Sequence, residues 1–422
     1  MKKKTVLSVD IGTTALKAAL SAEDAEKGIV VCAEARVPFS FSNKSCAARE
    51  WLPALKAAVL KMRESIDART DEDDPFFHLA GICISGNGPT LVAKDGTTLL
   101  WNEALSVSVP ENCKSLFIPR LLEFRSRFAG TWATSDTIFS GPEYLIFRLT
   151  NRAVTILPEF RYIGAYWDTR ALYDAGFSAL EHSKLPAFRS PGDCAGVISA
   201  DAAIALDGML PAGLPVFCGA PDFIVALIGT ATLSAGRLCD CAGSSEGINL
   251  CTKIPLRGEG IRTLPSVIAP LWNAAVLIPK SGIQMDEYKA KVEEKAGYSL
   301  SWNDFFERIF CDTSGAFSDG MAILRSQAEA VREAVKTLGD AAESAGLPAT
   351  HKMQVTGGQA LNPRWMQLKS DVSGIELETA SLPDAELTGD AVLARFGLGE
   401  YETIEDAAEA LVRPATVYTP QR

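Results

Sequence analysis

The sequence predicts an α/β protein of at least two domains. A chain of 422 residues, 47% of them hydrophobic, is too long for a single compact core. The N-terminal segment TVLSVDIGTTALKAAL reads as strand, turn and strand, because β-branched and apolar residues flank a Gly-Thr-Thr turn. About half a chain later, RLCDCAGSSEGINLC repeats this outline. The repeat indicates an internal duplication.

The composition favours a cytoplasmic protein with a small-molecule partner. A formal charge of −11 argues against a nucleic-acid partner, because phosphate binding needs a basic face. The ten cysteines contain no C-x-x-C pair, so neither a zinc site nor a disulfide framework is expected. Asp10 interrupts the first apolar run, and no apolar span is long enough for a membrane helix, so we expect no signal peptide and no membrane partner.

Both strand-turn-strand segments carry a turn that is suited to phosphate. Glycine frees the backbone, and adjacent hydroxyl groups add donors for phosphate oxygens. The same residues also favour ordinary hairpin turns, so both interpretations stay open. The candidate phosphate-binding residues are Gly12, Thr13 and Thr14 in the first turn and Gly243, Ser244 and Ser245 in the second.

A third glycine turn lies in MQVTGGQALNPRWMQLKSDVSG. The pattern predicts a strand, the pair Gly357 and Gly358, and then a helix with Asn362 as N-cap, Pro363 as first residue and Gly374 at its end. Two glycines let a flat ligand lie against the backbone, and a helix start favours polar or anionic groups. A plain strand-to-helix connection is the alternative.

One acid stands between two apolar runs in VFCGAPDFIVALIGTA. Burying the ionised carboxylate of Asp222 costs several kcal/mol unless the group is paired or has a function. A turn-forming aspartate bonded to nearby amides is the structural alternative.

These segments together resemble the FGGY family of carbohydrate kinases, in particular the xylulokinase- and gluconokinase-like members, within the actin-like ATPase superfamily. The first turn resembles the phosphate motif of that family, and the second resembles its Gly-Thr-Ser loop with Ser244 in place of threonine. VTGGQALNPRW resembles the adenosine motif, and GDAVLARFGLGEYETIEDA resembles the helix and loop that follow it. PEYLIFRLTN and LPAGLPVFCGAPD also resemble family segments. The likeness covers most of the chain in the family's order.

The resemblance implies two ribonuclease-H-like, actin-like ATPase domains with a central cleft, one over residues 1–237 and one over 238–422. It implies ATP and Mg²⁺ as cofactors and a small sugar or polyol as substrate, and a homodimer is compatible with it. Asp222 would be the general base, and Asp10 would hold Mg²⁺ through water. The implied adenosine residues are Gly357, Gly358, Gln359 and Asn362, and the implied sugar contacts are Asn87, Trp101, Asn102 and Glu103.

The sugar segments depart from the family pattern. Asn87 stands where glutamine is common, Glu103 replaces an aspartate, and Phe223 replaces the usual Asn or Gln beside the base. These changes leave an alternative open, in which a protein of this fold has lost catalysis and senses a sugar or nucleotide.

A serine hydrolase is the rival from another class. Residues 243–247 match G-x-S-x-G, and His351 follows in the expected chain order. A nucleophile elbow must lead from a strand directly into a helix, whereas INLCTKIP after Gly247 is typical of a strand. A P-loop motif does not occur.

Overall fold

The computed structural model describes residues 3–41, 43–68, 74–109, 113–243, 245–348 and 351–421. The chain divides into two compact units. Unit 1 consists of residues up to Gly229 together with the returning segment Glu386–Leu411, and unit 2 consists of Thr230–Ala385 and the residues from Val412 onward. The sequence predicts a single boundary, after Arg237, whereas the chain passes between the two units after Gly229, after Ala385 and after Leu411.

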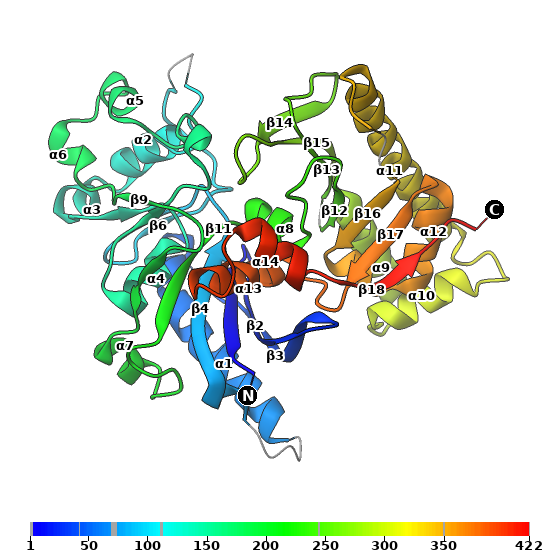
Figure 1. The fold of residues 1–422 in the computed structure, drawn as a ribbon, viewed down its shortest axis with the longest axis horizontal. Coiled ribbons are helices and arrows are strands. Elements are labelled where there is room, and N and C mark those ends of the chain that lie inside the picture. Colours follow the sequence, from blue (N-terminus) through cyan, green and yellow to red (C-terminus); the bar gives the residue numbers. More distant parts are fainter. Residues whose placement is uncertain are drawn as a thin grey trace. The chain divides into compact units, whose positions relative to one another are not determined.

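Unit 1 is built on a six-stranded mixed sheet with the order β10-β11-β4-β1-β2-β3 (Figure 1). Strand β1 pairs antiparallel with β2 and parallel with β4, and β4 pairs parallel with β11. The strands of this sheet are β1 (Thr5–Ile11), β2 (Ala15–Asp24), β3 (Gly28–Pro38), β4 (Leu79–Gly86), β10 (Cys194–Val197) and β11 (Pro215–Pro221). Short strands form two small additional sheets, and they are β5 (Leu91–Ala93), β6 (Thr98–Leu99), β7 (Ile138–Phe139), β8 (Thr155–Ile156) and β9 (Phe188–Arg189).

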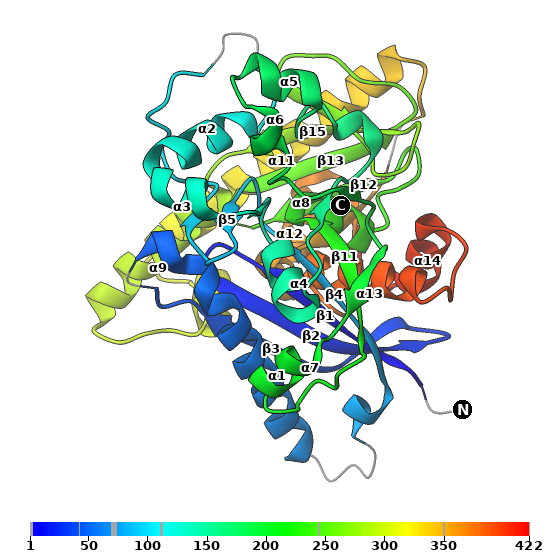
Figure 2. The ribbon, with the colours of Figure 1, turned by 90° about the vertical axis from the view of Figure 1, so that its left-hand side faces the viewer.

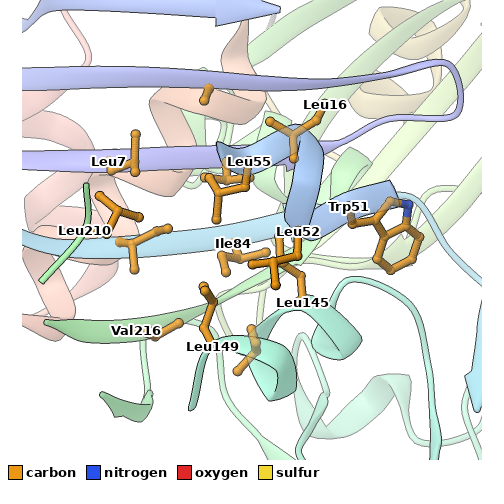
Figure 3. Close-up of a cluster of buried hydrophobic side chains, with 14 of the residues drawn as sticks. Leu7, Leu16, Trp51, Leu52, Leu55, Ile84, Leu145, Leu149, Leu210 and Val216 are labelled. Carbon is orange, nitrogen blue, oxygen red and sulfur yellow. The ribbon is translucent and has the colours of Figure 1, made fainter. Parts of the chain in front are cut away.

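Helix α1 packs along β2 and β3 of this sheet (Figure 2). Its apolar residues Leu52 and Leu55 meet Leu145 and Leu149 of α4 and strand residues such as Ile84 in one buried cluster (Figure 3). The α-helices of unit 1 are α1 (Trp51–Asp67), α2 (Ile118–Arg127), α3 (Ala129–Thr134), α4 (Glu143–Thr150), α5 (Thr169–Asp174), α6 (Ala179–His182), α7 (Ala200–Ala205), α8 (Asp222–Gly229), α13 (Ala385–Gly397) and α14 (Ile404–Leu411). Three 3-10 turns, η1 (Lys44–Glu50), η2 (Pro75–His78) and η3 (Phe160–Tyr162), join them.

Unit 2 is built on a seven-stranded mixed sheet with the order β14-β15-β13-β12-β16-β17-β18. Long helix α11 packs on α12, α9 and the inner strands, and a second apolar core lies beneath it. The elements are β12 (Leu238–Ala242), β13 (Glu246–Thr252), β14 (Ile261–Pro265), β15 (Trp272–Ile278), α9 (Ser281–Ala296), α10 (Trp302–Phe310), α11 (Ser318–Ser344), β16 (Lys352–Thr356), η4 (Gly358–Leu361), α12 (Pro363–Ser373), β17 (Glu376–Ala380) and β18 (Pro414–Tyr418).

The two sheets confirm the predicted duplication. In each unit a hairpin is extended by a third antiparallel strand on one side and by two parallel strands on the other. This is the strand order of a ribonuclease-H-like domain, so the predicted α/β fold class is confirmed. Ala242 of β12 pairs with Glu246 of β13, and Cys241 pairs with Gly247, so Gly247 lies in an antiparallel strand and not in the helix that a nucleophile elbow requires. Among the described residues, no helix combines the length and the apolar character needed to cross a membrane.

Candidate active site

Asp10 lies near the end of β1, inside the core of unit 1. Its side chain is almost fully buried, and the hairpin register sets it opposite Lys17 of β2. The Nζ atom of Lys17 lies 3.4 Å from Oδ2 of Asp10 and 3.8 Å from Oε2 of Glu386. A buried carboxylate is tolerated when a cation of this kind compensates it. Neither Lys17 nor Glu386 was among the residues predicted from the sequence.

Asp222 is the first residue of α8, directly after β11. Its Oδ1 atom accepts a hydrogen bond of 2.7 Å from the backbone N–H of Phe223. Burial raises the pKa of Asp222 to about 6, the negative charge of Glu386 acts in the same direction, and the Phe223 N–H and Lys17 oppose the shift. A carboxylate that titrates near neutrality is suited to accept a proton from a reacting hydroxyl group.

The first turn and the predicted sugar segments meet at one hydroxyl group. Oγ1 of Thr13 accepts hydrogen bonds from Nδ2 of Asn87 at 3.1 Å and from Nε1 of Trp101 at 3.0 Å. The backbone N–H of Trp101 donates to Thr90 at 3.2 Å. Trp101 keeps 39% of its surface exposed, so its ring can still contact a ligand. The structure therefore brings together three of the residues that the sequence singled out.

Glu103 lies in the same loop but binds protein groups. One carboxylate oxygen accepts a 3.0 Å hydrogen bond from the N–H of Leu100, and the other accepts one of 2.6 Å from Arg127. Arg120 donates to the backbone carbonyls of Leu100, Trp101 and Glu103. These contacts fix the loop that carries Trp101. The exposed Asn102 and Glu103 stay predictions as sugar contacts.

In unit 2, the two predicted glycines have different environments. Gly357 has φ 92°, and a Cβ atom there would lie 2.4 Å from the carbonyl oxygen of Ala242. Only glycine fits this close approach between the loop and the end of β12. A Cβ on Gly358 would meet no protein atom within 4 Å. Gly357 is therefore required by the fold, whereas Gly358 borders open space.

Gln359 links the two predicted nucleotide loops. Its Nε2 atom donates to the carbonyl oxygen of Gly243 at 3.4 Å and to Oγ of Ser281 at 3.3 Å. Its Oε1 atom accepts from Nε1 of Trp365 at 3.1 Å. Ser245 accepts a 3.4 Å hydrogen bond from the backbone N–H of Lys280. Ser244 lies outside the described residues.

The helix after this loop begins and ends as predicted. Oδ1 of Asn362 accepts a hydrogen bond of 2.9 Å from the N–H of Trp365, Pro363 is the first helical residue, and Gly374 ends α12 in a left-handed conformation. The capping pattern in the sequence was therefore sufficient to find this element.

Asp390 of α13 is a buried carboxyl group that the sequence reasoning missed. Its oxygens accept hydrogen bonds from Oγ of Ser85 at 2.8 Å and from Sγ of Cys83 at 3.4 Å. Burial raises the pKa of Asp390 well above its usual value, and the charge of Asp10 adds to the shift. A Cβ on the neighbouring Gly389 would lie 2.2 Å from the carbonyl oxygen of Val225, so α13 needs glycine here to pack this closely against α8.

The donor set near Asp10 fits Mg²⁺ better than a transition metal. The described part of the chain contains no group of three or more His, Cys, Asp or Glu side chains that could hold a metal. Mg²⁺ keeps several waters and takes one or two carboxylates together with substrate phosphates. The buried Asp10, with Glu386 nearby across Lys17, can meet that requirement.

The chain is similar to sugar kinases over nearly its whole length. It is 21% identical to the xylulose kinase of Bacillus subtilis (strain 168) over 499 aligned positions, which cover 99% of this chain and 93% of that enzyme. Among solved structures, the gluconate kinase of Lactobacillus acidophilus superposes with a TM-score of 0.73 at 14% identity, covering 100% of this chain and 94% of the other. The xylulose kinase of Rhodospirillum rubrum gives a TM-score of 0.70 at 18% identity, with coverages of 99% and 94%. No family model matches the chain.

Proposed function

We propose that this chain, which is similar to xylulose and gluconate kinases, is a carbohydrate kinase of the FGGY family that transfers the γ-phosphoryl group of MgATP to a hydroxyl group of a small sugar or polyol. Asp222 is the general base of this proposal. The observation that carries it is the position of Asp222 at the start of α8 with a pKa of about 6, in the same unit as the Asp10 and Lys17 pair.

Asp222 accepts the proton of the sugar hydroxyl group while the oxygen of that hydroxyl group attacks the γ-phosphorus of ATP. Phosphoryl transfer depends mainly on positioning and on neutralising charge on the transferred group. The Lys17 ammonium, held between Asp10 and Glu386, supplies fixed positive charge for this purpose. Bound Mg²⁺ would neutralise phosphate charge, and Asp10 would hold it through water.

The nucleotide contacts belong to unit 2 in this proposal. The phosphates lie along the turn of Gly243 to Ser245, and the adenosine lies against Gly358, where the backbone borders open space. The hydrogen bonds of Gln359 to Gly243 and Trp365 hold the two loops in register for one ligand. The start of α12, after Asn362, adds the positive end of a helix dipole near the same loop.

The sugar contacts belong to unit 1. Asn87 and Trp101 share the hydroxyl group of Thr13, so a sugar bound by these side chains would lie beside the first phosphate turn. Phe223 is 42% exposed next to the proposed base. An aromatic ring there favours the apolar C–H face of a sugar over a further hydroxyl group.

A substrate screen tests the proposed activity. Ketoses, aldoses, polyols and sugar acids are each incubated with MgATP, and release of ADP is followed. At least one of these compounds should stimulate ADP release above the rate without sugar. If a sugar binds tightly and none stimulates ADP release, the protein is instead a sensor of this fold, and the changed residues Asn87, Glu103 and Phe223 are its first determinants.

The pH profile should contain an acidic limb from Asp222. Because the base must be deprotonated and its pKa is about 6, kcat/KM should fall below that pH by about tenfold per pH unit. Glu386 raises the pKa of Asp222, so Glu386→Gln should move the limb to lower pH. The measurement is kcat/KM for the best sugar between about pH 4.5 and 8. A limb that moves to higher pH in Glu386→Gln would contradict this assignment.

Asp10→Ala should depress turnover and raise the Mg²⁺ requirement while the protein stays folded. An outer-sphere partner of a metal typically contributes about 10- to 100-fold in affinity or activity, and Lys17 still has Glu386 as a partner in this variant. Rates are measured against Mg²⁺ concentration, with thermal unfolding as the check of folding. Asp24→Ala is the matched control, because Asp24 lies at the exposed end of β2 and pairs with Lys3. Normal activity of Asp10→Ala at low Mg²⁺ would show that Asp10 has a structural role and does not hold the metal.

A further inference from the structure

Three charged side chains are completely buried beneath the second hairpin turn. Nζ of Lys369 lies 2.9 Å from Oδ2 of Asp240 and in contact with Oε1 of Glu246, and all three side chains are 0% exposed. They come from α12, β12 and the first residue of β13. We call Asp240, Glu246 and Lys369 the Lys369 cluster. Apolar residues of similar volume often stabilise a core as well as a buried ion cluster does, so stability alone does not explain these charges.

The Lys369 cluster is connected to both predicted nucleotide loops. The other carboxylate oxygen of Glu246 accepts a 2.7 Å hydrogen bond from Oγ of Ser281. The same Oγ atom accepts from Nε2 of Gln359 at 3.3 Å, and this amide also donates to the carbonyl oxygen of Gly243. Nε2 of Gln327 donates a hydrogen bond of 2.7 Å to the backbone carbonyl oxygen of Ser281. A continuous path of polar contacts therefore runs from Lys369 to Gln359 and Gly243.

The pKa values of the two carboxyl groups in this cluster are shifted in opposite directions. Burial and the charge of Glu246 raise the pKa of Asp240 well above its usual value. Against the effect of burial, Lys369 holds the pKa of Glu246 below its usual value. The Lys369 ammonium contacts both carboxyl groups and offsets their negative charge. Uncompensated negative charge beneath a turn that binds a polyphosphate would weaken that binding.

We propose that the Lys369 cluster, acting through Glu246, Ser281 and Gln359, positions Gly243 at the end of β12 against the loop of Gly357 to Asn362 for nucleotide binding. The inference rests on the proposed function, because these loops are its nucleotide-binding elements. Strands β12 and β16 pair as far as Cys241 and Thr356, so the sheet brings the two loops close together. The hydrogen bond from Gln359 to Gly243 joins the loops beyond the last paired residues. Ser281 is 1% exposed, so it acts through its partners and does not touch the nucleotide.

The test uses Ser281→Ala, which interrupts the path and leaves the three charges in place. Binding of MgADP is measured by calorimetry, and KM for ATP and for the sugar by steady-state kinetics. The dissociation constant for MgADP and the KM for ATP should each rise about tenfold. This is the size of effect expected when a buried group loses its hydrogen-bond partner. The KM for the sugar should stay unchanged, because its contacts lie in unit 1.

Ser370→Ala is the matched control. Ser370 is also a fully buried serine of unit 2, and its hydroxyl donates to the carbonyl oxygens of Ile375 and Tyr418, away from the path. This variant should lose a similar amount of thermal stability and keep the wild-type affinity for MgADP. If both variants bind MgADP like the wild type, or if both weaken MgADP binding equally, the inferred positioning role is wrong.

A second variant keeps the test decisive if Ser281→Ala does not fold. Gln359→Met removes the polar end of a partly exposed side chain and should also weaken the binding of MgADP about tenfold. Where Ser281→Ala folds, the double variant should bind MgADP no more weakly than either single variant, because both substitutions interrupt one path. Additive losses would overturn the inference. A wild-type protein that fails to bind MgADP would instead overturn the proposed function itself.

Discussion

Asp222→Asn is expected to lower kcat by about 10²- to 10⁴-fold, the usual contribution of general-base catalysis. Asparagine keeps the size of the side chain and one carbonyl oxygen that can accept the 2.7 Å hydrogen bond from Phe223. It cannot take the proton of the sugar hydroxyl. The measurement is kcat with the best sugar at saturating MgATP, and the affinity for ATP should change little. A variant that matches the wild-type kcat would show that Asp222 is not the base.

Asp168→Asn is the matched control for this experiment. Asp168 also stands at the start of a helix in unit 1, where its Oδ1 atom accepts a 2.7 Å hydrogen bond from the N–H of Ala171. Asparagine serves equally well at such an N-cap, so both stability and kcat should be retained. A loss of activity in Asp168→Asn would mean that the substitution acts through the fold.

Gly358→Val is expected to weaken the interaction with ATP by about 30- to 150-fold, which corresponds to 2–3 kcal/mol. Because a Cβ at this position meets no protein atom within 4 Å, the branched side chain would clash with the nucleotide and not with the fold. ATP affinity is measured directly, alongside the KM for the sugar, which should stay near the wild-type value. Unchanged ATP affinity would show that the nucleotide binds at another site.

Gly339→Val supplies the comparison for that result. Gly339 lies in α11 of the same unit and also has open space around its Cβ position. Valine there costs some helix propensity but should leave ATP affinity unchanged. Gly357→Val is not a useful control, because its Cβ would lie 2.4 Å from the carbonyl oxygen of Ala242.

Local signals in the sequence were sufficient for much of the fold. The two hairpins follow from alternating apolar residues around a glycine turn, and α12 follows from Asn362, Pro363 and Gly374. The return of the segment Glu386–Leu411 to unit 1 could not be found in this way. It depends on packing between residues far apart in the chain, such as Gly389 against Val225, and no local pattern encodes such a contact.

The residues of the candidate site likewise fall into those that local sequence signals indicate and those that depend on contacts between distant parts of the chain. The sequence singled out Thr13, Asn87 and Trp101, which the structure joins through one hydroxyl group. It missed Lys17 and Asp390, because their importance comes from strand register and from a helix of the returning segment. The roles of all these residues in binding and catalysis stay predictions until the variants are measured.

The most direct test follows an isotopically labelled γ-phosphoryl group from ATP to the sugar that gives the highest rate of ADP release. With wild-type protein, the label should appear on the sugar in amounts equal to the ADP formed, and Asp222→Asn should slow both by the same large factor. Label that appears only in inorganic phosphate, or an equal rate of transfer by Asp222→Asn, would contradict phosphoryl transfer to a sugar with Asp222 as the base.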